Sequence, residues 1–234
     1  MSPSRPPAVN ARAVFGTILL AACLLLYFNT QVLSKTETTL LILGDSLTAG
    51  YGVEKEQAFP FLLDHLLDQE GFSDVNVVNG GFSGSTTASA IQRMKWYMRI
   101  KPDIVIIELG ANDGLRGHPV ESIRANLEET IQFALENGIV TILAGMKLPV
   151  NYGKNYTQDF EEMFKQLADK YDLPFIPFIL KDVAGDPALN LPDGIHPNPE
   201  GHQIIARHLL SFVKPLLKEY RTSRHSSRPR PKTK

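Results

Sequence analysis

The sequence predicts an α/β fold in which a doubly wound parallel sheet of five strands forms a single domain. Two observations carry this prediction. Five short apolar runs alternate along the chain with five segments in which apolar residues recur every three or four positions. The first run, at 39–43, stops abruptly on Gly44, as expected for a central strand that is buried on both faces.

The remaining elements follow in order along the chain. After 39–43, strands are predicted at 75–78, 103–109, 139–144 and 174–180. Proline in a first turn and glycine at a C-terminus mark the helices, which are predicted at 56–70, 87–99, 119–138 and around 160–167, with a last one from Pro199 to about Tyr220. Pro215 is expected to interrupt this last helix.

Composition divides the chain into three parts, which are an N-terminal segment at 1–35, a single domain at 36–220 and a tail at 221–234. The domain holds 15 basic against 25 acidic residues, so it lacks the cationic face that binding to nucleic acid requires. The tail holds six basic residues, no acidic residue and few apolar ones, and it is therefore predicted to be disordered.

The N-terminal segment is predicted to direct export. Residues 13–28 are uncharged and follow two arginines, a pattern that sends the rest of the chain across a membrane. Three interpretations remain open: an uncleaved signal anchor, a cleaved signal peptide, or a lipoprotein with lipidation at Cys23, which ends the stretch Leu-Ala-Ala-Cys. Cys23 is the only cysteine, so the domain contains no disulfide or cysteine-based metal site.

Four polar, glycine-containing blocks lie next to the predicted strands. Three of them, at 44–46, 80–84 and 110–113, follow the first three strands, and the fourth, at 193–197, lies between the fifth strand and the last helix. The carboxyl ends of parallel strands meet at one edge of a sheet, where such folds bind their ligands. We therefore expect the four blocks to converge on one cleft, although Gly-Asp-Ser by itself also suits a plain turn.

The blocks supply the groups that acyl transfer requires. Ser46 is the candidate nucleophile, His196 the candidate base, and Asp193, three residues earlier, can orient the imidazole. The backbone N–H groups of Ser46 and Gly84 and the side chain of Asn112 are candidate donors for an oxyanion hole. The sequence therefore predicts a serine hydrolase.

The same blocks resemble those of the GDSL, or SGNH, hydrolases, which centre on Ser, Gly, Asn and His. The stretches Leu-Gly-Asp-Ser-Leu-Thr-Ala-Gly-Tyr, Glu-Leu-Gly-Ala-Asn-Asp-Gly-Leu-Arg-Gly and Leu-Pro-Val-Asn-Tyr-Gly-Lys are more similar still to the bacterial thioesterase I, lysophospholipase and arylesterase branch. The resemblance covers roughly residues 38–220. It implies a flavodoxin-like sheet, hydrolysis of acyl esters and thioesters with no metal or cofactor, and a periplasmic or secreted location. A retained anchor and a basic tail would depart from that branch.

Residues near the blocks receive more ordinary roles. Asp45 and Asp113 are expected to hold loop N–H groups, and His202 lies too far round its helix from His196 to share a metal ion. The long loop at 146–157 follows the fourth strand, so substrate contacts are predicted for Leu148, Pro149 and Tyr152.

Other functions remain open from the sequence alone. They are a deacetylase of carbohydrate or other small esters on the same fold, a metal-dependent phosphoesterase that uses Asp45, Asp113 and His196, and a non-catalytic binding module tethered to a membrane. Nothing in the sequence demands an assembly larger than a monomer.

Overall fold

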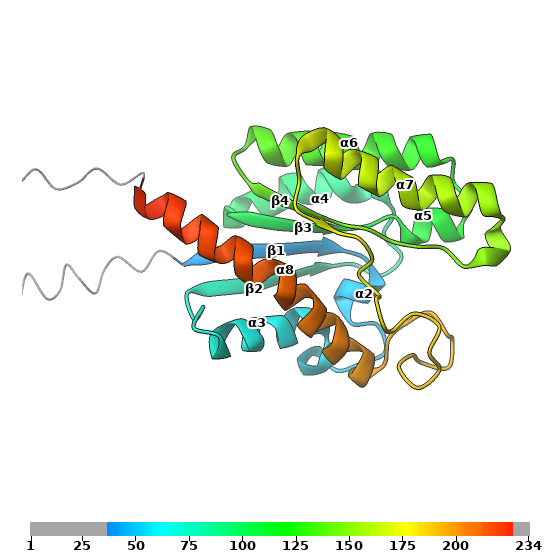
Figure 1. Cartoon of the computed structure of the whole chain (residues 1–234), viewed down its shortest axis with the longest axis horizontal. Helices are drawn as coiled ribbons and strands as arrows, with labels where there is room; N and C mark the ends of the chain where they lie inside the picture. Colours follow the sequence, from blue (N-terminus) through cyan, green and yellow to red (C-terminus); the bar gives the residue numbers. More distant parts are fainter. Residues whose placement is uncertain (1–36, 227–234) are drawn as a thin grey trace, which may run out of the picture. The chain divides into compact units, whose positions relative to one another are not determined.

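A computed structural model describes residues 37–226, and these residues belong to one compact unit. Its centre is a five-stranded sheet in the order β2-β1-β3-β4-β5, in which every neighbouring pair is parallel (Figure 1). The strands are β1 (Thr38–Gly44), β2 (Val75–Gly81), β3 (Ile104–Glu108), β4 (Val140–Ala144) and β5 (Phe175–Ile176). The predicted fold class is confirmed. The order reverses its direction between β1 and β3, which creates a switch point at their carboxyl ends.

Helices cover both faces of the sheet. The helices are α2 (Ser46–Ala49), α3 (Phe59–Gln69), α4 (Ala90–Tyr97), α5 (Ala111–Leu115), α6 (Val120–Glu136), α7 (Lys154–Tyr171) and α8 (Pro199–Ser226). On one face α3 packs against α8, while on the other α6 packs between α4 and α7 (Figure 1). This arrangement is the doubly wound one that the alternation of strands and helices predicts.

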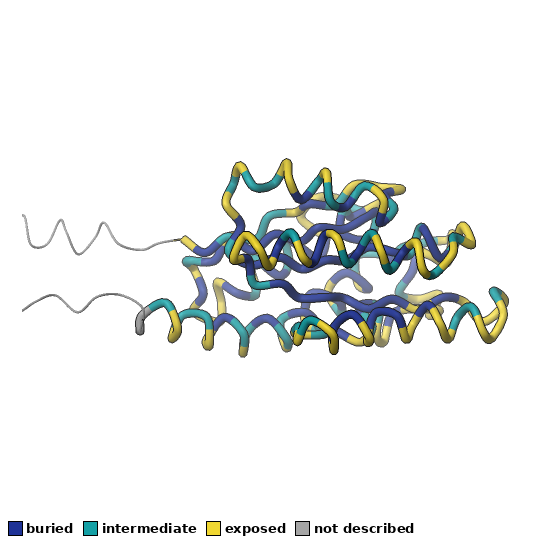
Figure 2. The backbone as a smooth tube through the Cα atoms, turned by 90° about the horizontal axis from the view of Figure 1, so that it is seen from above, coloured by how far each residue is buried: buried dark blue, intermediate teal, exposed yellow. Residues whose placement is uncertain are grey.

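The core lies between the sheet and its two helical layers. Leu40 to Leu43 of β1 and Ile104 to Ile107 of β3 are fully buried, as their unbroken apolar runs predict. Figure 2 shows these central strands buried along their length, whereas the helices expose only their outer sides. A rigid strand therefore leads directly to each of the polar blocks that follow β1 and β3.

Two strands differ in length from their predictions. β5 ends at Ile176 rather than at residue 180, because Pro177 has no N–H to donate to a ladder and the chain turns away there. β2 continues through Gly80 and Gly81, beyond the predicted end at residue 78. Glycine permits this extension, since a Cβ on Gly81 would lie 2.1 Å from the backbone nitrogen of Ala49.

The last helix corrects the prediction for the tail. α8 runs without interruption through Pro215 and reaches Ser226, so residues 221–226 are helical and not disordered. Val213 and Leu217 are buried on either side of Pro215, and their packing offsets the backbone hydrogen bond that the proline removes. Polar contacts fix the extension: the Tyr220 hydroxyl donates to Asp103 at 2.8 Å and Arg221 forms an ion pair with Asp74.

The predictions for the two ends of the chain fall largely outside the described residues. They are the signal or anchor segment at 1–35, lipidation at Cys23, and the rest of the basic tail at 227–234. Between residues 37 and 226, no helix has both the length and the apolar character that crossing a bilayer requires.

Candidate active site

The candidate nucleophile opens a one-turn helix directly after the first strand. β1 ends at Gly44, Asp45 caps α2, and Ser46 is the first residue of that helix. The Asp45 carboxylate accepts the N–H of Leu47 at 3.0 Å and the side-chain amide of Asn112 at 3.1 Å, so the expected loop-holding contact of Asp45 is confirmed. Ser46 has no partner for its N–H within the helix, because the first N–H groups of a helix have none.

A line of hydrogen bonds joins Ser46 to the block near the C-terminus. Nε2 of His196 lies 2.9 Å from Oγ of Ser46, and Nδ1 of His196 lies 2.8 Å from Oδ2 of Asp193. The other carboxylate oxygen of Asp193 accepts the N–H groups of His196 and Ile195. Hydrogen bonds from these backbone groups, and then from the imidazole, lower the pKa of Asp193 to about 2. Ionised Asp193 therefore holds the proton on Nδ1 and leaves Nε2 free to accept from Ser46.

Tyr51 is a part of the site that the sequence reasoning missed. Its ring centroid lies 4.5 Å from that of His196 at a tilt of 39°, and 53 % of the residue is exposed. The residue follows α2 by two positions, so its place beside the Ser46 block was the available signal. Tyr51 therefore packs against one side of the imidazole.

The candidate oxyanion donors lie in the loops after β2 and β3. Asn112 is in the first turn of α5 and reaches the Ser46 turn through its bond to Asp45. An amide side chain has two N–H groups, so one remains for a ligand. Gly84 has φ of 79°, which favours glycine, and its carbonyl accepts from Arg116 at 3.3 Å. The loop of Gly84 is tied to the nucleophile turn because the N–H of Phe82 donates to the Gly44 carbonyl.

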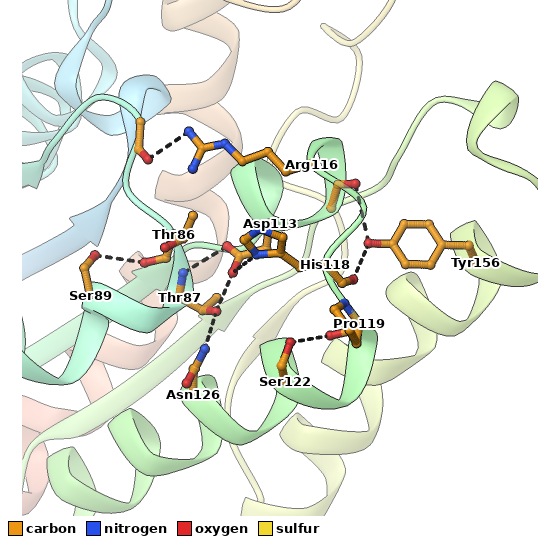
Figure 3. A network of polar contacts seen from close by, with 12 residues as sticks. Thr86, Thr87, Ser89, Asp113, Arg116, His118, Pro119, Ser122, Asn126 and Tyr156 are labelled. Carbon is orange, nitrogen blue, oxygen red and sulfur yellow. Dashed lines mark hydrogen bonds and ion pairs between the residues drawn. The ribbon is translucent and has the colours of Figure 1, made fainter.

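A buried network holds these two loops together (Figure 3). The Asp113 carboxylate accepts the N–H of Thr87 at 2.9 Å and its hydroxyl at 2.7 Å, and Asn126 donates to the same hydroxyl. Nδ1 of His118 lies 3.6 Å from the Asp113 carboxylate. The expected structural contact of Asp113 is confirmed, since it joins the start of α5 to the segment that follows Gly84.

Two of the three residues with predicted substrate contacts lie beside α5. Leu148 is buried and packs so closely on Gly114 that a Cβ there would lie 2.6 Å from Leu148 Cδ2. The hydroxyl of Tyr152 donates to the Leu115 carbonyl at 2.9 Å, while Pro149 is exposed. The loop is shorter than predicted because α7 begins at Lys154. Leu148 and Tyr152 thus brace the helix that carries Asn112, and contact with substrate stays a prediction.

His202, the next histidine along the chain after His196, lies in α8 and is buried. Nδ1 of His202 accepts the N–H of Phe59 at 3.2 Å, and burial lowers the pKa of His202 to about 4. Among residues 37–226, no three or more histidine, cysteine, aspartate or glutamate side chains gather as metal ligands.

A serine, a histidine and an aspartate that line up at the carboxyl edge of a doubly wound sheet define the class of serine hydrolases. Residues 42–204 match the GDSL-like lipase/acylhydrolase family, and the chain belongs to this family.

Curated relatives and solved structures agree with this membership. The chain is 39% identical to an arylesterase of Vibrio mimicus, over 78% of this chain and 92% of the relative. It is 35% identical to thioesterase 1/protease 1/lysophospholipase L1 of Escherichia coli K12, over 76% of this chain and 85% of the relative. The crystal structure of esterase EstA from Pseudoalteromonas has a TM-score of 0.73 at 34% identity and covers 77% of this chain and 99% of its own. The chain is therefore a hydrolase of ester bonds.

Proposed function

We propose that this enzyme cleaves acyl esters and acyl thioesters through a covalent acyl intermediate on Ser46. The observation that carries the proposal is the short line from Ser46 through His196 to Asp193, with 2.9 Å and 2.8 Å between its polar atoms. The names of the Vibrio arylesterase and the Escherichia coli thioesterase support ester and thioester substrates.

The first half of the reaction acylates the serine. Oγ of Ser46 attacks the acyl carbon while its proton passes to Nε2 of His196. The negative charge that develops on the carbonyl oxygen is received by the N–H groups of Ser46 and Gly84 and by the Asn112 amide. His196 then gives its proton to the leaving oxygen or sulfur as the bond from that atom to the acyl carbon breaks.

The second half releases the acid. Water attacks the acyl carbon of the intermediate and gives a proton to His196, and the bond to Oγ of Ser46 then breaks as the proton returns to Oγ. Asp193 remains ionised throughout and stabilises the imidazolium that forms twice in each cycle.

The substitution Ser46→Ala tests the proposal. We expect hydrolysis of p-nitrophenyl butyrate and of butyryl-coenzyme A to fall by at least about a thousandfold, because no nucleophile remains. A fluorophosphonate probe should label the wild-type enzyme once and leave Ser46→Ala unlabelled. Ser122→Ala is the control, since that hydroxyl only donates to the Pro119 carbonyl at the start of α6. Undiminished turnover by folded Ser46→Ala would refute the mechanism.

We further propose that Leu148, Pro149 and Tyr152 set the preference for acyl length. The position of their loop beside α5, which carries Asn112, supports this role. A series of p-nitrophenyl esters from acetyl to palmitoyl should give a changed length profile for Pro149→Ala and Tyr152→Phe. The same series separates a long-chain acyl hydrolase from the alternative, a deacetylase of small esters, which would turn over acetyl esters alone.

We also propose export to the periplasmic side of a bacterial inner membrane, with membrane association through the N-terminal segment and a monomeric enzyme. The uncharged stretch at 13–28 after two arginines supports this location. Fractionation of cells and the mass of the mature N-terminus distinguish a retained anchor from a cleaved signal, and Cys23→Ser abolishes membrane retention only if the chain is a lipoprotein.

A further inference from the structure

Glu108 is a fully buried acid that the proposed mechanism does not use. It is the last residue of β3, and none of its surface is exposed. Its Oε2 accepts the hydroxyl of Thr48 at 2.6 Å and the N–H of Asp45 at 3.3 Å. Its Oε1 is buried without a hydrogen-bond partner among the described residues. A buried polar group with an unmet hydrogen bond is costly, so its presence calls for a reason.

The fold makes room for this acid beneath the nucleophile. Glu108 pairs with Gly44 in the register between β1 and β3. A Cβ on Gly44 would lie 1.9 Å from Oγ1 of Thr48 and 2.4 Å from Oε2 of Glu108. The absence of a side chain at Gly44 therefore permits the contact between Thr48 and Glu108.

Side chains from the sheet, the turn and α4 hold the residues on both sides of Ser46. Glu108 holds the Asp45 amide on one side of Ser46 and the Thr48 hydroxyl on the other. Asp45 itself holds the Leu47 amide, and Arg93 of α4 donates to the Gly44 carbonyl at 2.8 Å and to the Gly80 carbonyl. Ser46 thus lies at the point of the turn, and its hydroxyl faces His196.

The surroundings of Glu108 favour its neutral form. The titratable and charged groups that face it are Asp45, from the turn after β1, and Arg93, from α4. The Asp45 carboxyl opposes a second negative charge, and Nη2 of Arg93 is bonded to backbone carbonyls. Burial, and then the charge of Asp45, raise the pKa of Glu108 well above its usual value.

We propose that Glu108 is a positioning residue for Ser46, whose Oε2 fixes both sides of the nucleophile turn. It does so as a neutral carboxylic acid. The inference rests on the proposed role of Ser46. A small displacement of a nucleophile from its attack position lowers the rate strongly, whereas contacts between the enzyme and the rest of the substrate are unaffected. Glu108 should therefore act on kcat and leave KM nearly unchanged.

Three variants test the role. E108A should lower kcat for p-nitrophenyl butyrate by about tenfold to a hundredfold, with KM within about threefold of the wild type. E108Q keeps an oxygen that accepts from Thr48 and Asp45, so it should recover most of the kcat that E108A loses. T48V should lower kcat several-fold, about as expected for one lost contact to Glu108. T141V is the matched control, because the hydroxyl of this buried threonine of β4 donates once, to the carbonyl of Ile139 just before the strand.

The protonation state of Glu108 is measured separately, by infrared spectroscopy. The infrared difference spectrum between wild type and E108Q at neutral pH should contain the carbonyl stretch of a protonated carboxylic acid. The absence of this band, or a kcat of E108Q as low as that of E108A, would overturn the neutral role. If E108A does not fold, E108Q, T48V and T141V still decide, since equal kcat values for T48V and T141V would refute the positioning role.

The outcomes separate this inference from the proposed function. Full activity of E108A together with an inactive Ser46→Ala refutes only the role of Glu108. Full activity of Ser46→Ala refutes the acyl-Ser46 mechanism, and the rate at which the fluorophosphonate labels Ser46 in each Glu108 variant reports the reactivity of the serine directly.

Discussion

The imidazole of His202 lies where α8 meets α3, and its Nδ1 accepts the N–H of Phe59. Burial lowers the pKa of His202 from 6.5 to about 4, so the fold binds a proton here less tightly than the unfolded chain does. The contribution of neutral His202 to the free energy of unfolding is therefore complete above about pH 6.5. It is lost as the pH falls toward 4, and the free energy of unfolding decreases by about 3 kcal/mol in total.

Urea unfolding at several pH values between these limits measures the loss. His202→Asn keeps an acceptor near the Phe59 amide but does not titrate, so its free energy of unfolding should be lower overall and less dependent on pH in this range. An acid dependence in His202→Asn equal to that of the wild type would assign the effect to other groups.

Asp193 offers a second prediction at the residue scale. Asp193→Asn keeps an oxygen for the backbone N–H groups of Ile195 and His196, but its amide N–H₂ faces Nδ1. This reversal places the imidazole proton on Nε2, where it cannot accept from Ser46. We expect kcat to fall on the order of a thousandfold with little change in stability. Asp186→Asn is the control in the same loop, where the carboxylate only accepts the N–H of Ala188. Near-normal kcat for Asp193→Asn would remove the orienting role.

At the scale of the element, the end of α8 is a stabilising part of the fold. Asp103 accepts from the Tyr220 hydroxyl, from Arg224 and from the N–H of Thr39, so it joins α8 to the start of β1. Deletion of residues 221–234 removes Arg224 and the ion pair of Arg221 with Asp74, and it should lower the free energy of unfolding by about 1–2 kcal/mol.

The matched truncation lacks only residues 227–234 and leaves all of these contacts in place. Guanidinium unfolding of the two truncated proteins measures the difference. Identical midpoints would mean that the helical extension contributes nothing to stability.

At the scale of the whole molecule, the sequence predicts best those strands that are buried on both faces. β1 and β3 are buried on both faces, so their composition alone predicts them, and the polar blocks that follow them identify Ser46 and Asn112 as site candidates. β5 was predicted too long, although the missing N–H of Pro177 was a local signal for its end. The end of α8 was predicted poorly, because the partners of Tyr220 and Arg221 are provided by distant parts of the chain. Local propensity does not contain such contacts.

The same reason explains which parts of the site were missed. Glu108 interrupts an apolar strand by a single acid, which was the available signal, but its partner Thr48 lies 60 residues away. Their meeting depends on the placement of β3 beside β1, a neighbour relation that periodicity alone does not contain. Tyr51 was missed for the same reason, because its contact with His196 depends on where the fold places the segment between β5 and α8.

The hydrogen bond between Ser46 and His196 spans 150 positions of the chain. Synthesis proceeds from the N-terminus, so the serine leaves the ribosome long before its base exists. A growing or unfolded chain therefore carries an ordinary, unreactive hydroxyl. Reactivity requires the two ends of the domain to be folded together, so turnover itself indicates that the whole domain has folded.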